Sequence, residues 1–416
     1  MLTYAFVLLL LAGIGVRLWL ATRQIRHVAA HRAAVPPEFS PRIGLHSHQR
    51  AADYTIARTK LGMFERLFDA TVLVGLTLMG GLQALDSIVA QWVSHDLGRQ
   101  LALIASVTLV LGVLGLPFTL YRQFVLEARF GFNRMTGKLF VQDTIKGVIV
   151  GSIIGLPLVA VVLWLMAAAG SYWWIWAWGV WTVFNVLILV LYPTLIAPLF
   201  NSFKPLDNPE LADRIRRLAE RCNFALGGLF VMDGSKRSAH GNAYFTGFGR
   251  ARRIVFFDTL LARLNADEIE AVLAHELGHF VRRHILQRIG VSFLMAFGFF
   301  ALLGWATGQP SFYEALGVTP RLDGSNDAMA LLLFFLIMPV ATYLLTPLSS
   351  WYSRRHEFEA DDYASAQSQP DFLVSALVKL YDDNAATLTP DPIHSAFYDS
   401  HPPASVRIRH LQGAGA

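Results

Sequence analysis

The chain has 416 residues, of which 54% are hydrophobic and only 16% are charged. Because soluble globular proteins carry about 25% charged residues, this composition indicates a membrane protein. The single cysteine, Cys222, excludes an intramolecular disulfide framework and any cysteine-rich zinc module. The formal net charge of +5 would also suit a nucleic-acid-binding protein, but the placement of the basic residues favours membrane topology, and we expect no nucleic-acid partner.

Seven apolar runs are each about long enough to cross a bilayer as a helix. They cover residues 2–20, 67–90, 101–121, 147–169, 172–200, 285–307 and 328–349. The first run has basic residues after it rather than before it, which is the reverse of a cleaved signal peptide. We therefore predict a retained membrane anchor with the N-terminus outside.

Lysine and arginine residues sort by side of the membrane when the seven runs are threaded from an outside N-terminus. The outer loops 91–100, 170–171 and 308–327 contain only Arg99 and Arg321. Nearly all other basic residues fall on the opposite side, as the positive-inside rule requires of the cytoplasmic side. The sequence therefore divides into transmembrane helices one to five in 1–200, a cytoplasmic segment in 201–284, helices six and seven in 285–349, and a second cytoplasmic segment in 350–416.

The first cytoplasmic segment opens with an amphipathic helix over residues 208–222. Asn208 supplies its cap, and the apolar stripe that follows is expected to pack on the core of this segment rather than on the membrane. Three strand-like runs come next, at 228–232, 242–246 and 253–257. They predict a small meander whose edge strand could pair with an extended peptide, although a sheet that only supports the next helix fits them equally well.

The helix predicted over residues 266–280 carries a His-Glu-Leu-Gly-His motif. A capping-box pattern begins this helix at Asn265. His275 and His279 are four residues apart and share one helical face, where two imidazoles can reach a single Zn²⁺ at about 2.0–2.1 Å. Glu276 is then placed to take a proton from a metal-bound water, whose pKa zinc lowers to about 7. A surface helix with two solvated histidines is the alternative for this motif alone.

A third metal ligand would leave one coordination position for water, and residues 354–363 supply the candidates. Glu357 and Asp361 are four residues apart on one helical face, which suits Glu357 as the ligand and Asp361 as an acceptor that fixes a ligand imidazole. His356 competes with Glu357 on spacing grounds, and Glu359 points elsewhere on the helix. A charged helix end next to the membrane is the alternative for this stretch alone.

Five stretches match the pattern of one family in order along the chain. They are Gly131-Phe132-Asn133-Arg134 with Asp143, residues 234–245, the motif at 275–279, Glu357-Phe358-Glu359-Ala360-Asp361, and His401-Pro402-Pro403. On these stretches the chain resembles the type I CAAX prenyl endopeptidases, which are integral-membrane zinc metalloproteases with seven spans. The resemblance runs over most of the chain. It implies an all-α multi-pass membrane protein with seven transmembrane helices and a cytoplasmic zincin-like α+β metalloprotease domain.

The resemblance assigns one zinc ion per chain to His275, His279 and Glu357. It also makes Glu276 the general base. It further implies that the helices enclose a large water-filled chamber with the zinc site at its cytoplasmic end. Charged residues near the ends of the predicted spans fit such a polar interior, although ordinary interfacial placement explains them too.

The resemblance also implies roles for residues around the reacting carbonyl. His401 and Arg407 would stabilise the oxyanion and orient the peptide, and Asn242 matches a family position that holds the substrate backbone. Without the family, His401 reads as a loop histidine and Arg407 as a solvated helix residue. Val406 stands where the family often has an acidic residue, so the assignment of Arg407 depends on spacing alone.

We therefore predict a zinc-dependent membrane endopeptidase that acts on peptide or protein substrates among membrane lipids, with prenylated CAAX-type C-terminal peptides as one substrate class. Residues 411–416 contain no retrieval signal for the endoplasmic reticulum, which favours a bacterial inner membrane. In that setting, the alternative is a quality-control protease of broad specificity. A non-hydrolytic peptide-binding scaffold and a transporter are alternatives of another class. Glu276 argues against the scaffold, because a scaffold needs no general base at that position. The three predicted zinc ligands and the cytoplasmic segments argue against the transporter.

Overall fold

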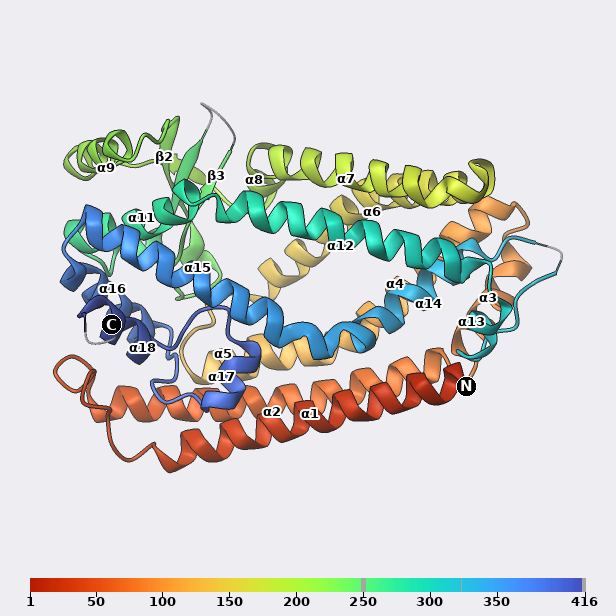
Figure 1. Cartoon of the computed structure of the whole chain (residues 1–416), viewed down its shortest axis with the longest axis horizontal. Coiled ribbons are helices and arrows are strands. Elements are labelled where there is room, and N and C mark those ends of the chain that lie inside the picture. The colour runs from red at the N-terminus through yellow and green to blue at the C-terminus, as the bar shows by residue number, and fades with distance from the viewer. Residues whose placement is uncertain (248–251, 323, 414–416) are drawn as a thin grey trace.

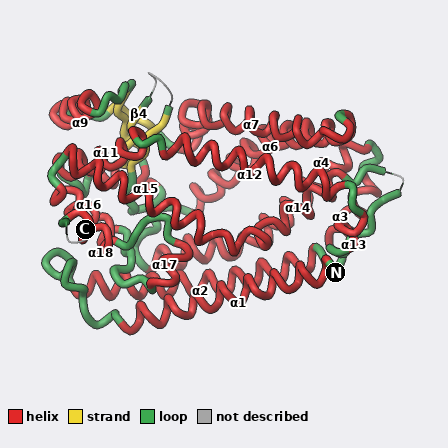
Figure 2. The backbone as a smooth tube through the Cα atoms, viewed as in Figure 1, coloured by secondary structure: helices red, strands yellow, loops and turns green. Residues whose placement is uncertain are grey.

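The computed structural model describes residues 1–247, 252–322 and 324–413. It is an elongated, mostly helical body in which long helices run roughly along the major axis and a small sheet lies toward one end (Figures 1 and 2). The N-terminus lies toward the opposite end, and the C-terminal helices gather at the end that holds the sheet. The apolar helices and the polar elements therefore occupy different parts of one molecule.

Six helical runs of the described chain are long and apolar enough to cross a membrane, and a bent pair supplies up to a seventh span. The helices concerned are α1 (Leu2–Ala30), the bent pair α2 (Leu45–Leu76) and α3 (Gly81–Trp92), α4 (Asp96–Tyr121), α6 (Gly137–Ala168), α7 (Trp173–Leu191), α12 (His284–Thr307) and α14 (Asp327–Thr342). Each of the seven predicted runs falls on one of them. The second run falls on the bent pair.

The bend between α2 and α3 measures 57°. Gly80, directly before α3, has a φ of +78°, a left-handed conformation that residues with a side chain rarely adopt. The glycine therefore lets the chain turn within a few residues. As a result, the second apolar run is a broken span rather than one straight helix.

Shorter elements connect the long helices. π-Helical turns over Arg122–Leu126 and Tyr192–Ile196 continue α4 into α5 (Glu127–Arg129) and α7 into α8 (Ala197–Phe200). The remaining short elements are α10 (Asp258–Leu261), α13 (Pro310–Glu314), α17 (Pro392–Tyr398), and the 3₁₀ turns Gly170–Tyr172, Gly234–Lys236 and Tyr343–Leu345.

Helix α14 passes through the 3₁₀ turn at Tyr343–Leu345 into α15 (Thr346–Gln367), so residues 327–367 form one helical run. The predicted boundary between residues 349 and 350 therefore falls inside a helix. The physical reason is that the sequence becomes polar here without a helix breaker, since neither proline nor glycine occurs between Pro347 and Pro370. One helix thus leads from the apolar region directly to the predicted third metal ligand.

The sheet has four strands in the order β1-β2-β4-β3, with β1 at Phe203–Pro205, β2 at Gly228–Met232, β3 at Ala243–Thr246 and β4 at Arg253–Phe257. β2 and β4 pair in parallel, whereas β1 and β3 pair antiparallel at the two edges. The predicted meander is wrong, because its three runs are not antiparallel neighbours in sequence order. Burial explains the order: β4 buries Ile254, Val255 and Phe256 between neighbours, while β3 is only half-buried and lies at an edge.

The polar elements share one hydrophobic core beside the sheet. Helix α9 (Pro209–Arg221) packs its predicted apolar stripe against α11 (Ala266–Val281), and α16 (Pro370–Asp383) and α18 (Ala404–Leu411) contribute to the same core. The capping box predicted for α11 is confirmed. The Asn265 side chain accepts from the Glu268 backbone N–H, and the Glu268 carboxylate accepts from the Asn265 N–H.

Candidate metal centre

Helices α11 and α15 approach each other closely at Gly278. A Cβ added at this glycine would lie 3.0 Å from Cα of Ala360 and 3.1 Å from Cβ of Tyr363. Both distances are shorter than an ordinary van der Waals contact, so the close approach depends on the missing side chain. This packing sets the histidine motif of α11 opposite the acidic stretch of α15.

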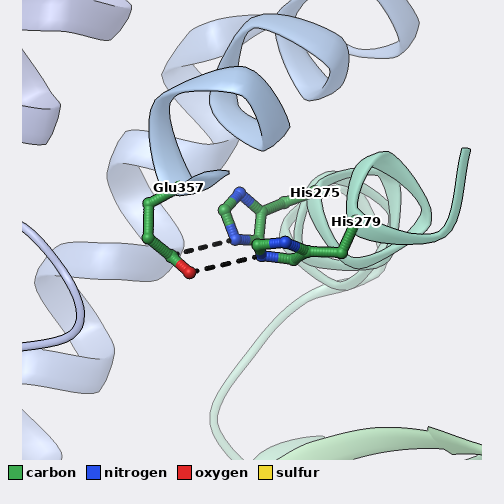
Figure 3. A group of neighbouring side chains, drawn as sticks. All are labelled: His275, His279 and Glu357. Atoms are coloured by element: carbon green, nitrogen blue, oxygen red, sulfur yellow. Dashed lines mark ion pairs between the residues drawn. The ribbon is translucent and has the colours of Figure 1, made fainter. Parts of the chain in front are cut away.

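His275, His279 and Glu357 converge at this crossing (Figure 3). Each offers one ligand atom, and these atoms lie within 4.8 Å of one another. Nε2 of His275 lies 3.5 Å from Oε2 of Glu357, and Nε2 of His279 lies 3.3 Å from Oε1 of the same carboxylate. Two imidazoles and one carboxylate form a donor set that suits a catalytic zinc ion.

The chemistry of the group fits a bound cation. Oε2 of Glu357 is buried and has no hydrogen-bond partner among the residues that the structure describes. A buried carboxylate oxygen left in this way is costly unless positive charge approaches it. Burial alone would lower the pKa of His275, but the Asp361 and Glu357 carboxylates raise it, so positive charge is favoured at this position. A metal ion would supply that charge to both side chains.

Asp361 and Arg407 support His275 from behind. Nδ1 of His275 lies 2.8 Å from Oδ1 of Asp361, which is the contact that the sequence predicts. Nε of Arg407 donates to Oδ2 of Asp361 at 2.9 Å, and its guanidinium also lies 3.7 Å from Glu357. All four side chains are buried. The structure thus places the Arg407 guanidinium on the Nδ1 side of His275, at 3.2 Å from that atom.

His279 has a different support, which sequence reasoning missed. Its Nδ1 lies 2.9 Å from Nδ1 of His284, and Nε2 of His284 lies 3.0 Å from Oε2 of Glu359. Arg283 has a φ of +59°, so the chain turns sharply before α12 and brings His284 back against the metal helix. His356, the competing ligand candidate, stacks on His284 with ring centroids 3.9 Å apart and lies outside the metal group. The sequence feature that could have indicated this contact is a histidine five residues after His279, at the junction between α11 and the next apolar run.

Three predicted residues lie outside the group of metal ligands and its buried support. Nε2 of His401 is 3.5 Å from Oε1 of Glu357, with 64% of the His401 side chain exposed. Glu276 is half-buried on α11 and makes no hydrogen bond or ion pair within the described part of the chain. Asn242 is exposed directly before β3, and its carbonyl accepts from the Phe257 N–H at 2.9 Å. Asn242 and His401 line one cavity of about 1020 Å³.

Two family models together match nearly the whole chain. Residues 24–202 match the model for the CAAX prenyl protease N-terminal region with five membrane helices, and residues 205–414 match the model for peptidase family M48. The first match ends directly before β1, and the second begins at the last residue of that strand.

Individual proteins are similar over nearly their full length. The chain is 34% identical over 406 residues to a CAAX prenyl protease 1 homolog of Oryza sativa subsp. japonica, with 93% of each covered. It is 30% identical to a CAAX prenyl protease 1 homolog of Homo sapiens, with 98% of this chain and 95% of that protein covered. Among solved structures, the crystal structure of S. mikatae Ste24p matches with a TM-score of 0.91 at 29% identity and covers 99% of both chains.

Proposed function

Since the chain belongs to peptidase family M48, together with the CAAX prenyl protease 1 homologues, we propose that His275, His279 and Glu357 hold its zinc ion. The chain is an integral, multi-pass membrane endopeptidase, and zinc dependence is general in this family. One observation carries the proposal: two histidines of one helix converge on a carboxylate whose buried Oε2 lacks a hydrogen-bond partner among the described residues.

The open side of the group accounts for the proposed hydrolysis. Zinc, when bound, polarises the scissile carbonyl and lowers the pKa of the attacking water to about 7. Glu276 takes the proton from that water and returns it to the leaving amine. His401 donates a hydrogen bond to the oxyanion that develops on the carbonyl, since its imidazole is exposed beside Glu357. Asn242 holds the substrate backbone beside the edge strand β3.

The buried side of the group positions the ligands. Asp361 accepts from Nδ1–H of His275, which fixes the tautomer whose Nε2 is free to bind metal. Arg407 donates to Asp361 and lies near Glu357, so it holds both carboxylates in place. We therefore assign Arg407 a positioning role, acting through Asp361, rather than contact with the substrate.

Glu276→Gln tests the assignment of the base. The variant should bind one zinc ion per chain, as measured by metal analysis of purified protein, yet cleave a peptide at least about 100-fold more slowly. Glu220→Gln on the exposed face of α9 is the matched control, and it should keep both properties. Full activity in clean Glu276→Gln protein would refute this mechanism. Loss of zinc from that variant would show that Glu276 serves the metal site instead.

We further propose that the substrates are prenylated C-terminal peptides. The proposal is supported by the relatives named CAAX prenyl protease 1 and by the cavity of about 1020 Å³ beside His401, which offers room for an extended peptide. A farnesylated CAAX peptide and its unprenylated twin would be compared with purified protein, with and without a zinc chelator. Chelator-sensitive cleavage of the prenylated peptide alone is expected. Equal cleavage of both would indicate broad specificity.

The proposed orientation puts the N-terminus outside and the metal group on the cytoplasmic side, in a bacterial inner membrane. The placement of lysine and arginine supports it. In addition, Arg321 of an outer loop pairs with Asp86 at 2.8 Å, and Arg99 lies 3.4 Å from Asp96, so both outer arginines have acidic partners. Ser94→Cys and Glu210→Cys, each made in a chain that carries Cys222→Ser, would test this orientation. An impermeant thiol reagent applied from outside should label only the first.

A further inference from the structure

Two stretches that carry the family pattern, residues 131–134 and 234–245, lie side by side in the structure. The first follows α5 directly, and its Arg134 N–H donates to the Arg237 carbonyl oxygen at 3.1 Å. The Arg237 guanidinium donates twice to the Asp143 carboxylate, at 2.9 and 3.1 Å. The turn after α5 and the start of α6 therefore hold the segment that precedes β3.

His240 lies within this segment and is held on both ring nitrogens, on one ring face and at its backbone. Its Nδ1 lies 2.8 Å from Oδ1 of Asn384, directly after α16, and its Nε2 lies 3.7 Å from Oε2 of Glu127 in α5. The ring of Phe132 stacks on it, with centroids 4.5 Å apart. The Thr259 hydroxyl donates to the His240 carbonyl oxygen at 3.0 Å. The position of His240 is thus fixed from several elements at once.

The partners of the His240 ring favour its charged form. Each ring nitrogen faces an acceptor oxygen, and only the imidazolium carries an N–H on both nitrogens. The Glu127 carboxylate raises the pKa of His240, although burial and the Arg58 charge oppose this rise. Glu127 is itself held, because the Tyr54 hydroxyl donates to it at 2.6 Å. A charge-assisted contact of this kind is stronger than a neutral one, so it ties His240 to the helical region.

Asn242 lies two residues beyond this anchored ring. Its side-chain oxygen accepts from the Ala243 N–H at 2.8 Å, and its backbone carbonyl accepts from the Phe257 N–H at 2.9 Å. The side chain is exposed, and its NH₂ group has no acceptor among the described residues. This group is therefore available to donate to a carbonyl of a bound peptide, within the cavity that Asn242 and His240 both line.

Gly241 is the only residue between His240 and Asn242. Glycine restricts the backbone less than any other residue, so it does not by itself fix the direction of its neighbours. The direction of the Asn242 side chain then depends on anchors on both sides of the glycine. Pairing with β4 supplies the anchor after Asn242, and the contacts of His240 supply the anchor before it.

We propose that His240 is a positioning residue, which fixes the direction of Asn242 toward the substrate backbone without itself contacting the substrate. The inference deepens the proposed function and rests on it, because Asn242 is part of the proposed substrate site. It gives residues 131–134 and Glu127 a role in hydrolysis at a distance from the metal group, since they hold His240. It also requires that loss of His240 acts on the substrate only through Asn242.

Steady-state kinetics test the proposal, with whichever of the two CAAX peptides the enzyme cleaves. His240→Ala should raise KM about 3- to 10-fold, as loss of one hydrogen bond to the substrate predicts, while kcat changes less than about twofold. Asn242→Ala should have the same effect, and the double variant should show no larger KM than either single one. His240→Gln, whose amide can still bond to a neighbour of the ring, should recover part of the loss. All variants should keep one zinc ion per chain.

His46→Ala is the matched control, because His46 is exposed at the start of α2 and is not among the described residues that line the cavity. It should leave KM unchanged. If His240→Ala does not fold, Asn384→Ala removes a partner of the ring and leaves residues 238–242 unaltered. It should raise KM about 2- to 5-fold alone, and not at all when Asn242→Ala is already present.

Two outcomes would overturn the inference while the proposed function stands. One is an unaltered KM in folded His240→Ala beside a raised KM in Asn242→Ala. The other is a double variant in which the two effects multiply to about 10- to 100-fold, because His240 would then act independently of Asn242. If Asn242→Ala left KM unchanged, Asn242 would not belong to the substrate site. That part of the proposed function would fail first, and the inference with it.

Discussion

Gly278→Ala tests whether the close approach of α11 and α15 builds the metal group. The added methyl would meet Cα of Ala360 at 3.0 Å, Cβ of Tyr363 at 3.1 Å and the Ala360 carbonyl oxygen at 3.2 Å. Two of these contacts are with backbone, so relief requires the helices to separate by a few tenths of an ångström. Replacing a mid-helix glycine by alanine stabilises a helix by about 1 kcal/mol, whereas overpacking costs about 1–3 kcal/mol. The net change in unfolding free energy should be a loss of about 0–2 kcal/mol.

The same separation should weaken zinc binding more clearly than it weakens the fold. Two ligands lie on α11 and the third on α15, and zinc sites tolerate ligand displacements of only about 0.2 Å. We expect the zinc dissociation constant to rise about tenfold or more, measured by competition with a chromophoric chelator, while thermal unfolding of the metal-free protein shifts little. Gly290→Ala on α12 is the control, because nothing lies within 4 Å of its added methyl. Unchanged zinc affinity in Gly278→Ala, with equal or higher thermal stability, would refute the reasoning.

Three further predictions concern the support around the group. Asp361→Asn removes the carboxylate to which the buried Arg407 donates and leaves only Glu357 at 3.7 Å, so it should cost about 3–5 kcal/mol of stability and weaken zinc binding. Denaturant unfolding and metal titration would measure the two effects, and wild-type values for both would contradict the pairing. His284→Ala removes the imidazole that lies 2.9 Å from Nδ1 of the ligand His279, and it should weaken zinc binding about 10- to 100-fold in the same titration. An unchanged zinc affinity would show that His284 contributes only to packing. Burial raises the pKa of Glu268, but hydrogen bonds from Lys379, the Asn265 backbone and Ser375 outweigh this and hold it below 4.5. Its carboxylate therefore stabilises the fold above pH 4.5. This contribution to the free energy of unfolding is lost as pH falls through the lower pKa that Glu268 has in the folded protein. Glu268→Gln should therefore flatten the fall in unfolding temperature at acid pH, and a profile identical to that of the unaltered protein would contradict this prediction.

The sequence by itself determined the features that arise from local periodicity. Apolar length located the membrane runs, because a helix needs about 20 residues to cross a bilayer. The spacing of His275 and His279 placed both imidazoles on one helical face, and the Asn265 cap located the start of that helix. Each of these depends on neighbours within a few residues. Local periodicity did not determine how the strands pair in the sheet, since the pairing of β2 with β4 depends on which strand is buried on both sides.

Only the tertiary structure decided which distant side chains meet. Glu357 and His356 are adjacent in sequence, and the direction in which α15 packs on α11 turns the first toward the histidines and the second onto His284. The packing of α18 against α15 placed Arg407 behind His275. Spacing along one helix fixes which residues share a face, but it cannot fix what that face meets. That depends on contacts between residues far apart in the chain, such as the close approach at Gly278.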